Sequence, residues 1–222
     1  MEIPAETVAV GRILRASRRT AARLKANPKA KVLQPKFKAQ HDALKARQTA
    51  YNDADDLAID AGATVDECDV NAREAVTGFQ LDLVSEVRRD YGHPLYVSFF
   101  AKGFAAAKDS SGADLQTVTT TLVSEIAKQP KDSKLHAHSK PLKAAADAYT
   151  APLADQKKAQ ANKNAAATAL SIERSKWIAA YDGLAGELRA LFPRRKALVE
   201  SFFGRFSSTR SKGKVAGGEA PK

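Results

Sequence analysis

The sequence SFFAKGF at residues 98–104 returns in shortened form as SFFGRF at residues 201–206. Two further patches return in the same order and at almost the same spacing. NPK at residues 27–29 corresponds to QPK at 129–131, an offset of 102. Six more positions match at a constant offset of 101, namely Arg73, Val76, Leu83, Glu86, Val87 and Arg88 with Arg174, Trp177, Leu184, Glu187, Leu188 and Arg189. Three patches in one order predict that the chain contains the same unit twice.

Hydrophobic residues recur at helical spacing through most of the chain, and no segment shows a sustained alternation of β-branched residues. We therefore expect an all-α protein, an internally duplicated helical bundle. Each of its two pseudo-equivalent halves should contain two long antiparallel helices flanked by one medium and one short aromatic helix. The predicted helices cover about 6–26, 35–61 and 65–91 with a short helix after 94, then 113–129, 139–161 and 165–192 with a short helix after 193.

The turns inside the two predicted hairpins are marked by short polar or glycine signals. Gly62 is the predicted stop in the first half, and residues 162–164 (NKN) stand at about the same place in the second. Pro152 interrupts the helical pattern, which predicts either a kink or a helix boundary. Pairing the two hairpins predicts a four-helix bundle with pseudo-twofold symmetry.

The expected domain organisation follows from the repeat. Residues 1–107 form the first helical repeat, and residues 108–206 form the second, packed with the first as one bundle. Residues 207–222 are small, polar and basic, which is typical of a disordered tail. The chain of 222 residues is 44% hydrophobic, but alanine dominates and aromatics are only 7%. Such a composition favours closely approaching helices.

The net charge of +11 is spread unevenly along this basic protein. Residues 1–48 carry +9, residues 49–92 carry −8 and residues 93–222 carry +10. A basic surplus attracts polyanions through long-range fields. The changes of sign leave a second account open, in which the basic first helix packs beside the acidic segment of its own chain.

The strongest functional candidate is a set of cations on the first predicted helix. Four of them form a stripe at helical spacing, and the whole set is a candidate polyanion-binding surface comprising Arg12, Arg15, Arg18, Arg19, Arg23 and Lys25. Such a stripe could follow a phosphate backbone. No helix-turn-helix or zinc-finger pattern accompanies it. An ordinary solvated helix face is the alternative interpretation.

The repeated aromatic segment is the other candidate. Its rings could plug the end of each half of the bundle, or they could form a patch for self-association or a protein partner. The residues concerned are Phe99, Phe100, Phe104, Phe202, Phe203 and Phe206.

Catalytic and metal-binding patterns are absent from the sequence. No nucleophile elbow, P-loop or dinucleotide fingerprint occurs. The spacing of the acidic run 53–69 does not fit an EF-hand loop, and His136 and His138 form at most a weak metal pair. Cys68, the single cysteine, lies among acidic residues and is predicted to be a small core residue. We expect no enzyme activity, no cofactor, no metal site and no small-molecule substrate.

The predicted location follows from the cysteine count and from the lack of a signal-peptide pattern or a membrane-spanning run. Because the chain has one cysteine, no internal disulfide can form. The first residues do not resemble a signal peptide, and no run approaches the ~18 apolar residues of a membrane span. We expect a cytoplasmic protein that does not bind membranes.

The predicted function is that of a non-enzymatic helical-bundle protein with a structural or protein–protein interaction role, through a protein partner or self-association. The alternative is a nucleic-acid-associated protein that binds phosphate backbone non-specifically through its basic first helix and tail.

Overall fold

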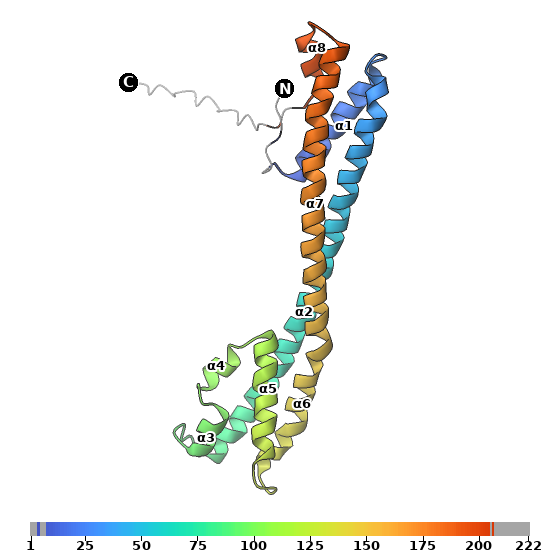
Figure 1. Ribbon diagram of the computed structural model, residues 1–222. Helices are drawn as coiled ribbons and strands as arrows, with labels where there is room; N and C mark the ends of the chain where they lie inside the picture. Colours follow the sequence, from blue (N-terminus) through green and yellow to red (C-terminus); the bar gives the residue numbers. More distant parts are fainter. Residues whose placement is uncertain (1–3, 5–7, 205, 207–222) are drawn as a thin grey trace, which may run out of the picture. The chain divides into compact units, whose positions relative to one another are not determined.

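The computed structural model describes residues 4, 8–204 and 206, and all the regular elements among them are helical. The prediction of an all-α protein is therefore confirmed (Figure 1). The predicted tail, residues 207–222, lies outside the described residues. In chain order the elements are α1 (Val10–Ala26), η1 (Lys31–Leu33), α2 (Gln34–Glu86), α3 (Pro94–Phe99), α4 (Phe104–Lys108), α5 (Gly112–Ala127), η2 (Lys134–His138), α6 (Ser139–Ala148), α7 (Thr150–Leu191) and α8 (Lys196–Ser201).

The two long helices are continuous where the sequence predicted turns. α2 is 53 residues long and contains Gly62, and α7 is 42 residues long and contains residues 162–164. The predicted hairpin inside each half is therefore wrong. A glycine costs a helix only about 1 kcal/mol relative to alanine, and the good helix formers around Gly62 outweigh that cost. Asparagine is a still weaker helix breaker than glycine.

Pro152 stands in the first turn of α7, directly after the boundary at Tyr149 that separates α6 from α7. Of the two alternatives for this proline, the helix boundary is the one observed. Proline is tolerated there because the first backbone N–H groups of a helix have no partner within the helix.

The chain divides into two compact units. The first unit consists of residues 1–50 and 167–222, and the second consists of residues 51–166. Each unit takes residues from both predicted repeats, 1–107 and 108–206, and those repeats remain a prediction from the sequence. Both long helices contribute to both units.

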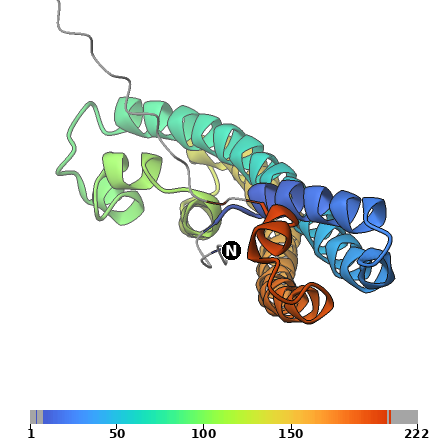
Figure 2. The same ribbon diagram turned by 90° about the horizontal axis from the view of Figure 1, so that it is seen from above.

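The core of the first unit forms around Trp177 and Tyr181 of α7, which are stacked with ring centroids 4.8 Å apart. Phe37 of α2 tilts against Trp177 at 6.0 Å. The buried indole N–H of Trp177 donates a 3.1 Å hydrogen bond to Oγ of Ser17 on α1, since a buried tryptophan needs a partner for this group. α1 and α8 thus gather beside α7 (Figures 1 and 2).

The core of the second unit forms around Phe79 of α2. Its ring meets Phe99 of α3 edge-on at 4.9 Å, and it is fully buried. α5 adds Leu115 and Leu122 to the same core, and α6 adds Leu142. α3, α5 and α6 lie along the C-terminal part of α2 (Figure 1) because each buries one apolar stripe there.

Candidate polyanion-binding surface

The tertiary structure concentrates positive charge in the first unit. Its described residues contain 18 Lys/Arg and 5 Asp/Glu, a net charge of +13. The second unit, residues 51–166, contains 13 Lys/Arg and 17 Asp/Glu, a net charge of −4. The cause is that residues 167–204 fold together with the basic N-terminal region rather than with the segment that precedes them. The two basic ends of the chain thus contribute to one unit, while the acidic segment lies in the other.

α1 presents the predicted cations in two groups. The helix buries Ile13, Ser17, Thr20 and Leu24 on one face. At about 100° per residue, one flank holds Arg12, Arg15, Arg19 and Arg23 within an arc of about 80°. Arg18 and Lys25 lie on the opposite flank. All six are exposed except Arg23, which is half-buried. The structure thus brings four of the six residues together as one surface, called here the arginine flank.

The six cations of α1 are not neutralised by the described part of the chain. Arg15 Nε donates at 3.4 Å to the backbone oxygen of Gly11, within its own helix. None of the ion pairs found among residues 8–204 includes any of the six. Other basic residues of this unit are paired. Lys36 Nζ lies 2.8 Å from Glu187 Oε1, and Lys38 pairs with Asp42.

His41 lies in the same unit and was not singled out by the sequence. It is 8% exposed, and its Nδ1 has no hydrogen-bond partner in the described structure. Burial lowers the pKa of His41. The negative charge of Asp42 opposes this shift, and the charges of Arg18, Lys38 and Lys45 add to it. A signal was present in the sequence, because His41 follows Phe37 and precedes Leu44 at helical spacing on one face.

The six repeated phenylalanines lie in the two cores. Phe104 is half-buried, and the other five are 3–7% exposed. Phe203 and Phe206 meet the Tyr181 ring edge-on at 4.9 and 5.7 Å, and Phe100 meets Phe104 at 5.5 Å. Of the two interpretations, the burial of these rings favours packing within the cores, and a role as an interaction patch stays a prediction. These rings fill the space between helices, and burying that much apolar surface is more favourable than exposing it.

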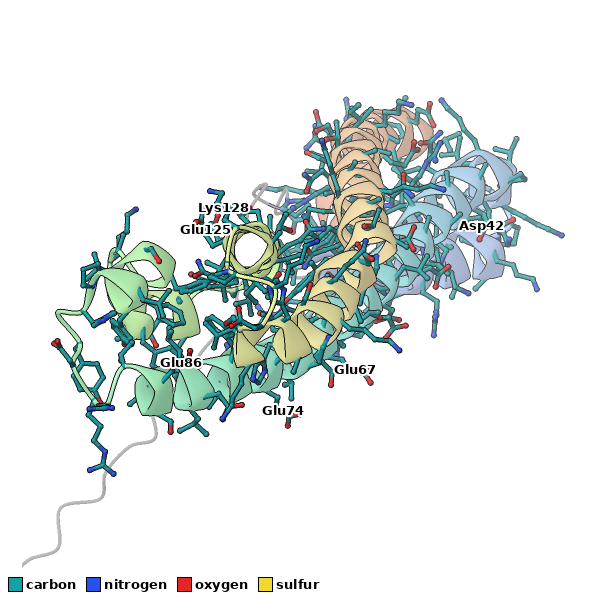
Figure 3. The ribbon with its side chains drawn as sticks, turned by 90° about the horizontal axis from the view of Figure 1, so that it is seen from below. Asp42, Glu67, Glu74, Glu86, Glu125 and Lys128 are labelled. Atoms are coloured by element: carbon teal, nitrogen blue, oxygen red, sulfur yellow. The ribbon has the colours of Figure 1, made fainter. Side chains whose placement is uncertain are left out.

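The acidic run of α2 belongs to the second unit, and its members differ. Asp69 is 4% exposed and accepts hydrogen bonds from Tyr149 and Gly112, so it is structural rather than solvated. Asp55 pairs with Lys163 at 2.6 Å. Glu67 points away from the ribbon into solvent (Figure 3). Pairing of residues 53–69 with the basic first helix stays a prediction.

The remaining reactive side chains have ordinary surroundings. His138 Nε2 lies 2.7 Å from Asp82 Oδ2, and His136 Nε2 lies 3.0 Å from the Pro130 oxygen. Cys68 packs against the core of the second unit, and burial followed by the charges of Glu67 and Asp69 raises the pKa of its thiol. No group of three or more His, Cys, Asp or Glu residues within the described ranges could hold a metal ion.

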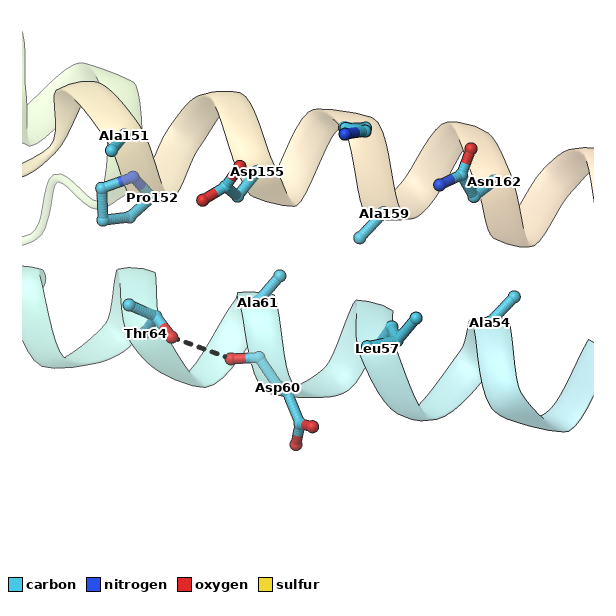
Figure 4. A pocket seen from close by; sticks show the side chains of 11 residues that line it. Ala54, Leu57, Asp60, Ala61, Thr64, Ala151, Pro152, Asp155, Ala159 and Asn162 are labelled. Carbon is cyan, nitrogen blue, oxygen red and sulfur yellow. Dashed lines mark hydrogen bonds between the residues drawn. The ribbon is translucent and has the colours of Figure 1, made fainter.

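A groove of about 410 Å³ lies between α2 and α7 in the second unit. Ala61 of α2 and Ala159 of α7 point toward each other across it, while the carboxylate of Asp60 turns outward (Figure 4). Leu57 also lines it and is 62% exposed. The groove is therefore an apolar strip with charged edges.

No helix in the described part of the chain is both long enough and apolar enough to cross a membrane. Comparison with known proteins gives no further guide to the site: no family model matches the chain, and neither a curated protein nor a solved structure is significantly similar to it.

Proposed function

We propose that this protein acts by binding rather than by catalysis, and that its first unit binds the phosphate backbone of nucleic acids. The observation that supports this is the net charge of +13 on the described part of that unit, where the arginine flank of α1 forms no ion pair. A surface of this kind attracts polyanions and releases their counterions on binding.

The length of the arginine flank suits a nucleic-acid strand. Arg12 and Arg23 are separated by about 16 Å along α1, at ~1.5 Å per residue. This distance matches the rise of about five phosphates along one strand of a duplex. Arginine adds planar, charge-assisted contacts to phosphate oxygens. No element of the proposed surface reads base edges, so the binding is expected to be non-specific.

The test is the salt dependence of binding to mixed-sequence duplex DNA. Replacing Arg12, Arg15 and Arg19 by Gln should lower the slope of log affinity against log salt by about 0.9 for each phosphate that the variant no longer neutralises. The matched control replaces Lys131, Lys134 and Lys140, three exposed lysines of the second unit, by Gln. Equal reductions of the slope in the two variants, or no binding at low salt, would overturn the proposal.

A protein-interaction role is the second candidate, and the groove of the second unit supports it. Leu57 of α2 lines this groove and is 62% exposed. Self-association that buries Leu57 would give a concentration-dependent mass in light scattering, which Leu57→Ser should abolish. A strict monomer at all concentrations would argue against this role.

We also infer that the chain is an internal duplication. Both halves contain a medium helix, a 3₁₀ turn, a long helical stretch and a short aromatic helix, in that order. Arg73 donates to the backbone oxygens of Lys108 and Ser110, at 3.2 and 2.9 Å, just before α5. Arg174, at an offset of 101, donates to the Val8 oxygen at 2.5 Å, just before α1. Each arginine thus binds the segment that leads into the other half's medium helix. This supports the equivalence of the two halves, in which each half packs against the medium helix of the other.

A further inference from the structure

The turn between α7 and α8 holds a second concentration of positive charge, separate from the arginine flank. A hollow of about 300 Å³ opens there in the first unit. Phe192, Val199 and Glu200 contribute to its lining. The other lining residues are all exposed cations, namely Arg189, Arg194, Arg195 and Lys196.

The hollow has an apolar base. Phe192 is 7% exposed and Val199 is 4% exposed. The Phe192 ring stacks on Phe202, with centroids 6.0 Å apart and an interplanar angle of 22°. This packing fixes the base against the core of the unit. Charges that face a low-polarity base interact more strongly with an ion than charges surrounded by water do.

One cation of the hollow is held on a strained backbone. Arg194 has a φ of 65°, a left-handed conformation that is costly for any residue except glycine. Pro193 ends the preceding helical stretch, and the Arg195 N–H closes the turn by donating to the Phe192 oxygen at 3.2 Å. Glycine would satisfy this turn at lower cost. Backbone strain of this kind is a reason to look for a role of the side chain.

The four cations have no acidic partner in the part of the chain that the structure describes. None of them takes part in an ion pair among residues 8–204. Glu200 contributes one negative charge to the lining. The hollow thus keeps a positive surplus around a space that can hold a small anion.

We propose that this hollow binds a single phosphate group, either as free inorganic phosphate or as the terminal phosphate of a nucleic acid. Guanidinium groups match phosphate oxygens in geometry, and a dianion is the small ion that several clustered cations neutralise best. This inference deepens the proposed function and rests on it for its ligand class, but it names a different group of residues.

The experiment is a calorimetric titration of the full chain with inorganic phosphate at low ionic strength. Arg195→Gln and Arg189→Gln should each weaken phosphate binding about tenfold, the loss typical of one charge-assisted hydrogen bond. The third variant is Arg194→Gly, which removes a cation and relieves strain together. It should raise the midpoint of denaturation and yet weaken phosphate binding.

Arg88→Gly is the matched control, because Arg88 has a φ of 53° and belongs to the second unit, whereas the hollow belongs to the first. It should raise the midpoint and leave phosphate binding unchanged. If Arg194→Gly behaves as Arg88→Gly does, Arg194 has no role in binding; if none of the three hollow variants weakens phosphate binding, the proposal is overturned.

The source of the phosphate is separated by a second arm. Oligonucleotides of one sequence are compared with a 5′-phosphate and with a 5′-hydroxyl. Preference for the phosphorylated end, abolished in Arg195→Gln, assigns the hollow to nucleic-acid ends, whereas binding of free phosphate without such a preference assigns it to the free ion. If the chain binds neither free phosphate nor a phosphorylated end preferentially, while the arginine flank still binds duplex DNA, only the proposal for the hollow is overturned. Phosphate binding without any nucleic-acid binding overturns the proposed function instead.

Discussion

The hydroxyl of Tyr149 donates a 2.7 Å hydrogen bond to the carboxylate of Asp69 inside the second unit. The same carboxylate oxygen accepts the backbone N–H of Gly112 at 2.7 Å, at the first residue of α5. Arg73 approaches the other oxygen at 3.4 Å. One buried acid therefore ties α2, the start of α5 and the α6–α7 boundary together. Burial first, and then the hydrogen bond to Asp69, raise the pKa of Tyr149.

Removing the tyrosine hydroxyl should destabilise the protein. Tyr149 is fully buried, and Tyr149→Phe leaves Asp69 with one good donor fewer. The expected loss is about 1–3 kcal/mol of unfolding free energy, since an under-satisfied buried charge is costly. Urea denaturation measures it. Tyr91→Phe, at a residue 57% exposed, should have no effect, and equal stability of the two variants would refute the role of this hydrogen bond.

Acid should weaken the first unit through His41. Its folded pKa lies below the ordinary 6.5, so the folded state binds a proton less readily than the unfolded state does. Stability is therefore complete above pH 6.5, falls as the pH drops below that value, and the loss is full once the pH is below the folded pKa. His41→Leu should flatten this part of the pH–stability curve. A variant curve parallel to that of the parent chain would contradict the assignment.

The chain segment after α8 passes very close to α1 at Gly204. A Cβ added there would lie 3.0 Å from the Ala16 Cβ and 3.5 Å from its Cα. Gly204→Ala should therefore cost about 1–3 kcal/mol through overpacking. Gly186→Ala is the control, because nothing lies within 4 Å of the added group in α7. It should stabilise the helix by about 0.5–1 kcal/mol. Thermal unfolding compares the two.

Continuity of α2 through Gly62 can be tested directly. The nearest atom to an added Cβ is Gln156 Nε2, at 3.9 Å, so alanine fits without strain. Gly62→Ala should raise the unfolding free energy by about 0.5–1 kcal/mol, because alanine is the better helix former. A turn at this position would instead require glycine, and a destabilised variant in chemical denaturation would point to that turn.

The equivalence of Arg73 and Arg174 predicts matching local effects. Arg73→Gln should speed hydrogen exchange in the segment before α5, because the Lys108 and Ser110 oxygens lose their donor. Arg174→Gln should do the same in the segment before α1, where Val8 loses its donor. Hydrogen exchange followed by mass spectrometry resolves the two segments. Loosening in only one variant would remove this support for the duplication.

Most helix positions were predictable from the sequence, because helical periodicity and proline act over a few residues. Pro152 marks the α6–α7 boundary for this reason. Gly62 misled the prediction, because its intrinsic cost of about 1 kcal/mol is smaller than what neighbouring helix formers and packing supply. Asp69 could not be told from its acidic neighbours, since its partners Tyr149 and Gly112 lie far along the chain.

By itself the sequence determined that this protein is helical, where most helices begin and which patches recur at an offset of 101. Only the tertiary structure decided that the aromatic segments form core, that Arg12 and its neighbours form no ion pair within residues 8–204, and that residues 167–204 join the basic N-terminal region. The physical reason is the distance along the chain over which each effect acts. Propensity and periodicity are local, whereas burial and net charge depend on which distant segments the fold brings together.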